Sequence, residues 1–136
     1  MKGMKFDIRL VVAALVLAAT AATTSSAQAP RVKEVMRAKL DHSQRILEAV
    51  VTSNWTLLDR ESREMGLVVR DPAWQSMVMP EFIRYSEAFV RATEDLTEAA
   101  KTRDLERASL GLVSLTTSCV NCHRYLARAR IASGAR

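Results

Sequence analysis

Cys119, Cys122 and His123 form the pattern Cys-Val-Asn-Cys-His near the end of the 136-residue chain. Two thiols three positions apart can each add to one of the two vinyl groups of a porphyrin, and the imidazole that follows can then bind the iron. This spacing is typical of a covalent haem attachment site of the c type. The pattern contains both cysteines of the chain and one of its two histidines. We therefore expect one covalently bound haem c, with His123 as the proximal iron ligand.

Three other uses of these residues fit less well. A zinc site would add His42 to the set, but a cysteine and a histidine that are adjacent cannot easily reach one tetrahedral ion, and the chain has no second CxxC. A thioredoxin-like CxxC would require a βαβ setting, and nothing in the sequence indicates a sheet. A disulfide between Cys119 and Cys122 would close a small, strained ring within a helical segment. The pattern favours haem over these alternatives.

The first 27 residues have the features of a cleaved secretory signal peptide. A positively charged start is followed by a short apolar core over residues 10–19 and by small residues that end in Ser25-Ser26-Ala27. Because this end matches the small-x-small pattern, we expect cleavage after Ala27. Cleavage after Ala29 is less favourable, since Pro30 would then follow the scissile bond. An uncleaved membrane anchor also fits less well, because the apolar core is too short to span a bilayer comfortably.

Export agrees with the haem motif, because c-type haem is attached outside the cytoplasm in bacteria. We therefore expect a periplasmic protein without a stable membrane span, with a single domain over residues 28–136 that is long enough for one core. The formal net charge of the whole chain is +5, and basic residues are scattered among acidic ones except at the C-terminus. Nucleic-acid binding is not expected, since the sequence has no basic groove with interleaved aromatic residues.

Apolar residues at helical spacing predict that the mature chain is all-α. We expect helices over residues 30–51, 55–65 and 80–101, and a fourth from about residue 105 that carries the haem motif. Gly66 is expected to end the second helix, and residues 67–79 to form the one long connection. Helices joined mostly by short turns indicate an antiparallel four-helix bundle, here with one covalently bound haem. The side chains expected to face the core are Val32, Val35, Met36, Leu40, Ile46, Leu47, Val50, Trp55, Leu58, Ser62, Met65, Phe82, Tyr85, Phe89, Ala92, Leu96, Ala99, Leu105, Leu112, Leu115, Cys119, Cys122 and Leu126.

An exported chain of four helices with a haem motif near its C-terminus resembles the class II c-type cytochromes, the cytochrome c prime group. The resemblance rests on Cys119, Cys122 and His123, and on the stretch from Val35 to Leu40, where the group has the distal side of its haem pocket. It implies thioether links from the two cysteines and proximal ligation by the histidine. Some members pair through their first two helices, so a homodimer with Trp55 and Leu57 in the contact is an open possibility.

The resemblance implies two types of distal site. A methionine as sixth iron ligand gives a low-spin electron carrier, whereas an apolar side chain that blocks this position gives five-coordinate iron that binds diatomic gases. On a helical wheel with Val32 at zero and an apolar face centred at about 10°, Met36 falls at about 40° and Leu40 at about 80°. Met36 is therefore our first choice of distal ligand, and Leu40 as a blocking side chain is the second. His42, at about 280°, is the third, and a lysine or another methionine is the remaining alternative.

These expectations combine into one hypothesis of function. We expect an exported monohaem c-type cytochrome that transfers single electrons to and from redox partner proteins and is not an enzyme. A five-coordinate protein that binds NO or CO is the first alternative, and a haem-bearing accessory subunit of a respiratory complex is the second. Arg124, next to the proximal ligand, is a candidate contact for the haem propionates. Arg37 is a weaker candidate, because it falls at about 140° on the wheel, on the solvent side.

Overall fold

The computed structural model describes the backbone of residues 31–134 and the side chains as far as Arg130. This part of the chain is almost entirely helical and contains no β-strand, so it is all-α, as the sequence predicts. The expected signal segment, residues 1–27, lies outside the described residues. The elements are the first helix (residues 31–51), α2 (Trp55–Leu67), a 3₁₀ turn (Val68–Arg70), α3 (Pro72–Gln75), α4 (Pro80–Thr102) and α5 (Leu105–Gly134).

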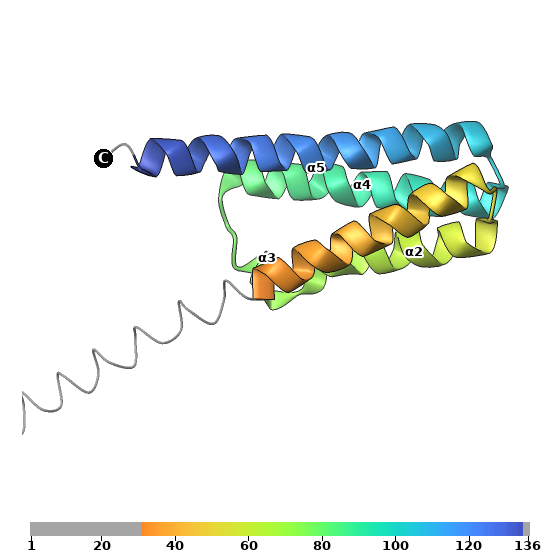
Figure 1. The fold of residues 1–136 in the computed structure, drawn as a ribbon, viewed down its shortest axis with the longest axis horizontal. Helices are drawn as coiled ribbons and strands as arrows, with labels where there is room; N and C mark the ends of the chain where they lie inside the picture. Colours follow the sequence, from red (N-terminus) through yellow and green to blue (C-terminus); the bar gives the residue numbers. More distant parts are fainter. Residues whose placement is uncertain (1–30, 135–136) are drawn as a thin grey trace, which may run out of the picture.

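The long helices run in alternating directions along one axis (Figure 1). Helix α4 packs against both α2 and α5. At one end of the molecule, short turns join the first helix to α2 and α4 to α5 (Figure 1). At the other end these two pairs of helices spread apart, and α3 lies beside the start of the first helix. The haem motif of α5 belongs to this second, more open end.

The two short turns at the closed end are fixed by local side chains. Ser53 adopts a left-handed backbone conformation (φ 53°), and the Asn54 side chain then caps α2 by accepting a hydrogen bond from the Leu57 amide at 3.1 Å. Arg103 is also left-handed (φ 53°), and Asp104 accepts a hydrogen bond from the Arg107 amide at 2.9 Å. These caps satisfy amides that have no partner within their own helix and set where α2 and α5 begin.

The prediction that Gly66 ends the second helix is wrong. Helix α2 continues through Gly66 to Leu67, and the 3₁₀ turn follows it directly. A Cβ atom at Gly66 would lie 3.1 Å from Thr93 Oγ1 on α4. The glycine is therefore a site of close approach between α2 and α4, not a helix stop. The expected long connection is correspondingly shorter, because the 3₁₀ turn and α3 occupy much of residues 67–79.

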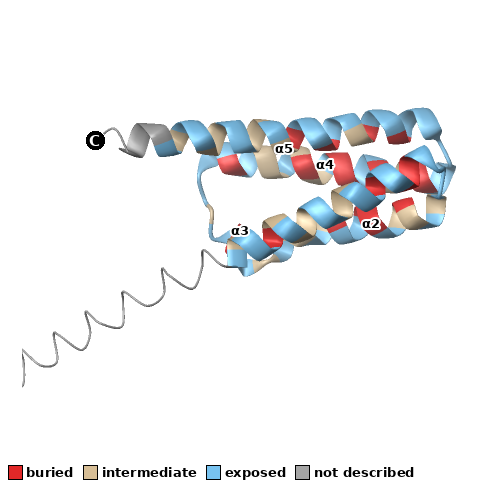
Figure 2. Ribbon diagram, viewed as in Figure 1, coloured by how far each residue is buried: buried red, intermediate tan, exposed pale blue. Residues whose placement is uncertain are grey.

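The core follows the inward faces of the long helices (Figure 2). A larger cluster fills the closed end and the middle, and it includes Ile46, Leu58, Met65, Phe89, Leu96 and Leu115. A smaller cluster of Val35, Trp74 and Phe82 lies at the open end, where Met36 and Cys122 pack against it. The prediction that Leu47 and Leu105 are buried is wrong, since their exposed fractions are 50% and 48%. The prediction that Leu40 faces the core is also wrong, since it is 48% exposed and lines a cavity that opens between the first helix and α5.

No helix within residues 31–134 is both long enough and apolar enough to cross a bilayer.

Candidate haem site

The two cysteines and the histidine of the haem motif line the same cavity as three residues of the proposed distal stretch. Cys119, Cys122 and His123 come from α5, whereas Met36, Lys39 and Leu40 come from the first helix. The cavity has a volume of about 380 Å³. Its other lining residues are Ser43, Trp74, Tyr85, Phe89, Thr116, Ser118 and Leu126. The fold thus brings together two segments that are about 80 residues apart in the sequence.

The cavity has a buried inner wall and an exposed mouth. Trp74 and Phe89 are buried and form the aromatic part of the inner wall. Leu40, Thr116 and His123 are exposed lining residues, so the mouth lies between the first helix and α5. A planar ligand in this cavity would therefore contact rings on its inner side and reach solvent along the other.

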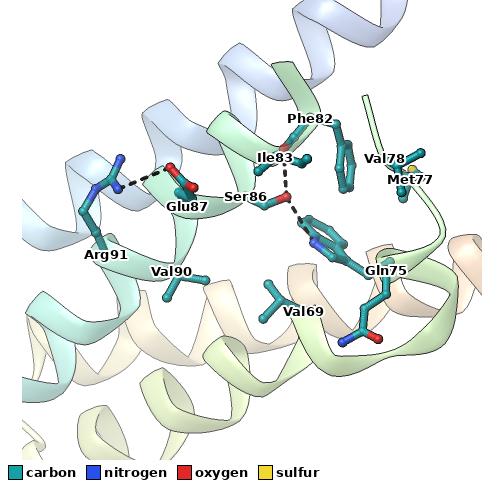
Figure 3. Close-up of a pocket in the computed structure, with 11 residues that line it drawn as sticks. Val69, Gln75, Met77, Val78, Phe82, Ile83, Ser86, Glu87, Val90 and Arg91 are labelled. Carbon is teal, nitrogen blue, oxygen red and sulfur yellow. Dashed lines mark hydrogen bonds and ion pairs between the residues drawn. The ribbon is translucent and has the colours of Figure 1, made fainter. Parts of the chain in front are cut away.

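Trp74 is held in place by the short helix α3. Asp71 caps this helix by accepting a hydrogen bond from the Ala73 amide at 2.8 Å, and Pro72 occupies its first turn. The indole Nε1 of Trp74 donates to Ser86 Oγ on α4 at 3.1 Å, and Ser86 in turn donates to the Phe82 carbonyl (Figure 3). The indole ring also packs against Phe82, with ring centroids 5.0 Å apart. Because its polar atom is paired and its faces are packed, Trp74 gives the inner wall a fixed position.

Trp74 also belongs to the lining of a second cavity, whose side chains Figure 3 draws. It has a volume of about 450 Å³ and is lined mostly by apolar side chains of α4 and of the segment before it, including Val69, Val78 and Ile83. No cysteine or histidine lines it. The two cysteines and His123 line the first cavity, whereas Met77 is the one side chain of the second cavity that could bind a haem iron, so we place the candidate site in the first.

Both cysteines are free thiols and are partly buried. Burial raises the pKa of the Cys122 thiol, and Cys119 acts in the same direction, whereas the nearby charge of Lys39 lowers it; the pKa lies above its ordinary value. The Cys122 thiol is therefore protonated at neutral pH. The two cysteines are not joined to each other, so both sulfur atoms are available for thioether bonds to vinyl groups.

Lys39 is the unexpected member of the lining. Its Nζ atom lies 4.1 Å from the centroid of the Trp74 ring and 3.7 Å from that of Phe89. Aromatic faces attract a cation, and this attraction offsets part of the cost of removing the ammonium from water. Burial lowers the pKa of Lys39 to about 8, although Cys119 and Cys122 act in the opposite direction. The helical wheel carries one signal for this position, because Lys39 falls at about 340° on it, inside the apolar face.

His42 pairs with a buried carboxylate and is not placed to bind an iron in the cavity. Its Nδ1 atom is hydrogen-bonded to Glu61 Oε2 of α2 at 2.8 Å. Arg60 donates to the other oxygen of the same buried carboxylate at 2.8 Å, and Arg45 lies 3.5 Å from it. Burial raises the pKa of Glu61, but these partners outweigh that effect, and its pKa lies below its ordinary value. His42 ties the first helix to α2 and is not a lining residue of the cavity.

The remaining candidates for propionate contacts and for a methionine ligand do not line the cavity. Arg37 and Arg124 are exposed, next to Met36 and His123 respectively. Met65 is fully buried in the larger core cluster, and Met79 accepts a hydrogen bond from the Tyr125 hydroxyl at 3.9 Å. Within the described part of the chain, no three His, Cys, Asp or Glu side chains gather into a group that could hold a metal ion by themselves. The zinc set with His42 is therefore not assembled in this structure.

Comparisons with protein-family models, with curated proteins and with solved structures found no match to the chain. What the cavity can bind is inferred from its own side chains. Its volume falls within the range of roughly 300–1,000 Å³ for ligand sites, and its inner wall is apolar and aromatic. Two thiols and an imidazole line it from α5, and a thioether lines it from the first helix. These residues fit a haem, because they offer two attachment points and two types of axial ligand.

Proposed function

We propose that the protein is an exported, periplasmic monohaem c-type cytochrome that carries single electrons, folded as an antiparallel four-helix bundle of the class II kind. One observation carries this proposal. The Cys-Val-Asn-Cys-His motif of α5 and Met36 of the first helix line one cavity, although they are far apart in the sequence. Such an arrangement is what axial ligation from two helices requires.

Four residues of the cavity have a definite task in this proposal. Cys119 and Cys122 hold the haem by thioether bonds, and His123 binds the iron from α5. Met36 is the candidate for the opposite axial position, and a thioether at this position raises the reduction potential. The haem supplies a one-electron Fe(III)/Fe(II) couple when it is bound. The chain needs no acid–base pair for such a reaction.

The surroundings of the cavity suit electron transfer. Trp74 and Phe89 are buried, so the inner side excludes water from the porphyrin face. Burial and nearby charge are among the factors by which a protein sets the reduction potential of a haem, and the Lys39 ammonium over these rings supplies such a charge. The mouth between the first helix and α5 leaves one side open, where a partner protein can approach.

Gas binding is the second candidate function, and Leu40 is the observation that favours it. Leu40 lines the cavity at its mouth, one helical turn from Met36. If Leu40 covers the distal face in place of a ligand, the iron is five-coordinate and open to NO or CO. The identity of the distal residue therefore separates the two functions.

Optical spectra of the matured protein, recorded in the ferric and ferrous states with and without carbon monoxide, test the proposal. We expect a low-spin spectrum with a methionine-to-iron charge-transfer band and little reaction with carbon monoxide. In Met36→Ala the band should disappear and carbon monoxide should bind readily. Leu40→Ala is the matched control, since it removes an apolar side chain from the same helix face and should keep the band. A high-spin ferrous spectrum in the unmodified protein that carbon monoxide shifts at once would support gas binding instead.

A further inference from the structure

Helix α5, which lies along one edge of the helical assembly in Figure 1, has apolar side chains on two opposite faces. On a helical wheel with the buried Leu115 at zero, one face consists of buried residues within about 60° of it. These residues are Ala108, Gly111 and Ser118. Leu110, Val113 and Val120 fall at about 140° to 220°, on the opposite face. Their exposed fractions are 63%, 62% and 49%, so this second face has no partner in the described part of the chain.

The outer face of α5 has the spacing of a helix-packing seam. Its positions alternate in steps of four and three residues, and all of them lie within about 40° of the direction opposite Leu115. This alternation is the pattern by which two helices pack along a common axis. The positions are Glu106, Leu110, Val113, Thr117, Val120 and Arg124, and all six are exposed. We refer to these six residues as the α5 seam.

The surroundings of the α5 seam are also free of charge. Residues 108–123 contain no Asp, Glu, Lys or Arg, whereas α4 carries exposed charges at successive turns, for example Glu87, Arg91 and Glu94. The hydroxyl groups beside the seam are paired within their own helix. Ser109 Oγ donates to the Leu105 carbonyl at 2.8 Å, and Thr116 Oγ1 donates to the Leu112 carbonyl at 2.9 Å. A contact on this face would therefore bury these donors without leaving them unpaired.

The first helix adds exposed apolar side chains on its side next to α5. Leu40 lines the cavity between the two helices, and Leu47 lies two turns further along, about 20° from Leu40 around the axis. Their exposed fractions are 48% and 50%. Exposed apolar surface that is continuous in this way is typical of a protein–protein contact.

The α5 seam is complementary to a second copy of itself. Two copies related by a two-fold axis through the middle of the seam would pack their α5 helices antiparallel, so that each contact occurs twice. The facing residues are then Leu110 with Val120, Val113 with Thr117, and Glu106 with Arg124. Neither Glu106 nor Arg124 forms an ion pair within the described part of the chain. The same register therefore brings together the apolar residues and the two opposite charges.

We propose that two copies of this chain associate through the α5 seam as a two-fold dimer with antiparallel α5 helices. A second copy fits better than a strongly charged partner, because the middle of the seam has no charge to attract one. The formal net charge of the chain is +5, so two copies repel least where they meet through a face whose own charges cancel. This contact is not the one through the first two helices that the family resemblance implies, and it does not depend on bound haem.

Sedimentation equilibrium of the mature protein, with a reductant present to prevent disulfides between copies, tests the proposal. We expect a dimer, and Val113→Asp should raise its dissociation constant at least about tenfold, because it buries two unpaired carboxylates in the contact. Ile83→Asp makes the same kind of change at an exposed position of α4 and should leave the constant within about twofold. Circular dichroism shows whether each variant keeps its helices.

Charge reversal tests the antiparallel register. Glu106→Arg or Arg124→Glu alone places like charges opposite each other and should raise the dissociation constant about threefold or more at low salt. The double variant restores opposite charges and should return the constant to within about twofold of the unmodified protein. Glu94→Arg, an exposed reversal on α4, is the matched control and should have little effect.

A protein that is monomeric at every concentration, or a dimer that Val113→Asp leaves unchanged, would overturn the proposal. Failure of the double variant to restore association would overturn the antiparallel arrangement on which it rests. A monomer whose binding to phosphatidylglycerol vesicles is lost in Val113→Asp would overturn it in favour of a lipid surface. Haem absorbance of the same samples reports separately on the proposed function.

Discussion

At the scale of single residues, the position of Lys39 on its helix could be predicted from the sequence, but the partners of its charged end could not. The helical wheel put it inside the apolar face, yet a lysine at such a position usually extends its charged end to water. Here the Nζ atom lies over the rings of both Trp74 and Phe89. Trp74 could not be foreseen as its partner, because α3 was expected to be part of an irregular connection. The capped sequence Asp71-Pro72 was the available signal for that short helix.

The position of Lys39 has a consequence for stability that depends on pH. Below pH 8 the ammonium is charged in the folded and in the unfolded chain, and its burial lowers the free energy of unfolding. Between about pH 8 and its ordinary pKa of 10.5, the unfolded chain holds a proton that the folded chain has lost, so the free energy of unfolding increases as pH rises. We predict that Lys39→Met stabilises the haem-free protein at pH 7 by about 1–3 kcal/mol and removes this increase.

Urea unfolding of the haem-free chain at pH 7 and pH 9.5 measures both effects. Lys101→Met is the control, since it removes an exposed lysine and should change the free energy of unfolding by less than about 0.5 kcal/mol. If Lys39→Met is less stable than the unmodified chain at pH 7, the cation–ring contacts stabilise the fold more than burial of the charge destabilises it.

At the scale of the elements, periodicity located the long helices and most of their buried faces, but not the limits of those faces. Leu47 and Leu105 follow the apolar spacing and are nevertheless exposed. Leu105 is the first residue of α5, beyond the reach of the neighbouring helices, and Leu47 lies at the margin of the first helix's buried face. Glycine was equally ambiguous. Glycine often follows the last residue of a helix, which is why Gly66 was expected to end α2. In the structure Gly66 instead allows α2 and α4 to approach closely at Thr93, a contact that the sequence cannot reveal.

Gly111 is the strongest case of such an approach. A Cβ atom there would lie 3.0 Å from both Cγ and Cδ2 of Leu96, which is fully buried on α4 and cannot move aside freely. Overpacking of this kind costs about 1–3 kcal/mol, whereas replacing a helical glycine by alanine contributes up to about 1 kcal/mol of stability. We therefore predict that Gly111→Ala lowers the free energy of unfolding by about 1 kcal/mol.

Thermal unfolding followed by circular dichroism measures this change. Ser114→Ala, an exposed position on the same helix, is the matched control and should shift the midpoint little in either direction. A midpoint for Gly111→Ala equal to or above that of the unmodified protein would mean that α4 and α5 are less tightly packed than the structure indicates.

At the scale of the whole molecule, the two ends of the helical assembly differ in a way that suits a bound cofactor. The closed end is filled by the larger core cluster and held by capped turns. The open end contains a smaller cluster, and the cavity with its thiols and imidazole lies beside it. The sequence predicted which residues would meet there, because the haem motif and the stretch around Met36 each carry their own signal. It could not predict the aromatic inner wall, since this wall arises only when α3, α4 and the first helix come together.

The most direct test of the central proposal is the mass of the mature polypeptide after expression with a cytochrome c maturation system. We predict a chain that begins after the signal segment and carries one covalently bound haem, which remains attached in denaturant, whereas the Cys119→Ser, Cys122→Ser double variant carries none. A known c-type cytochrome expressed in the same cells is the control for maturation. A bare polypeptide mass in the unmodified protein, alongside a fully loaded control, would contradict the assignment of this cavity to haem.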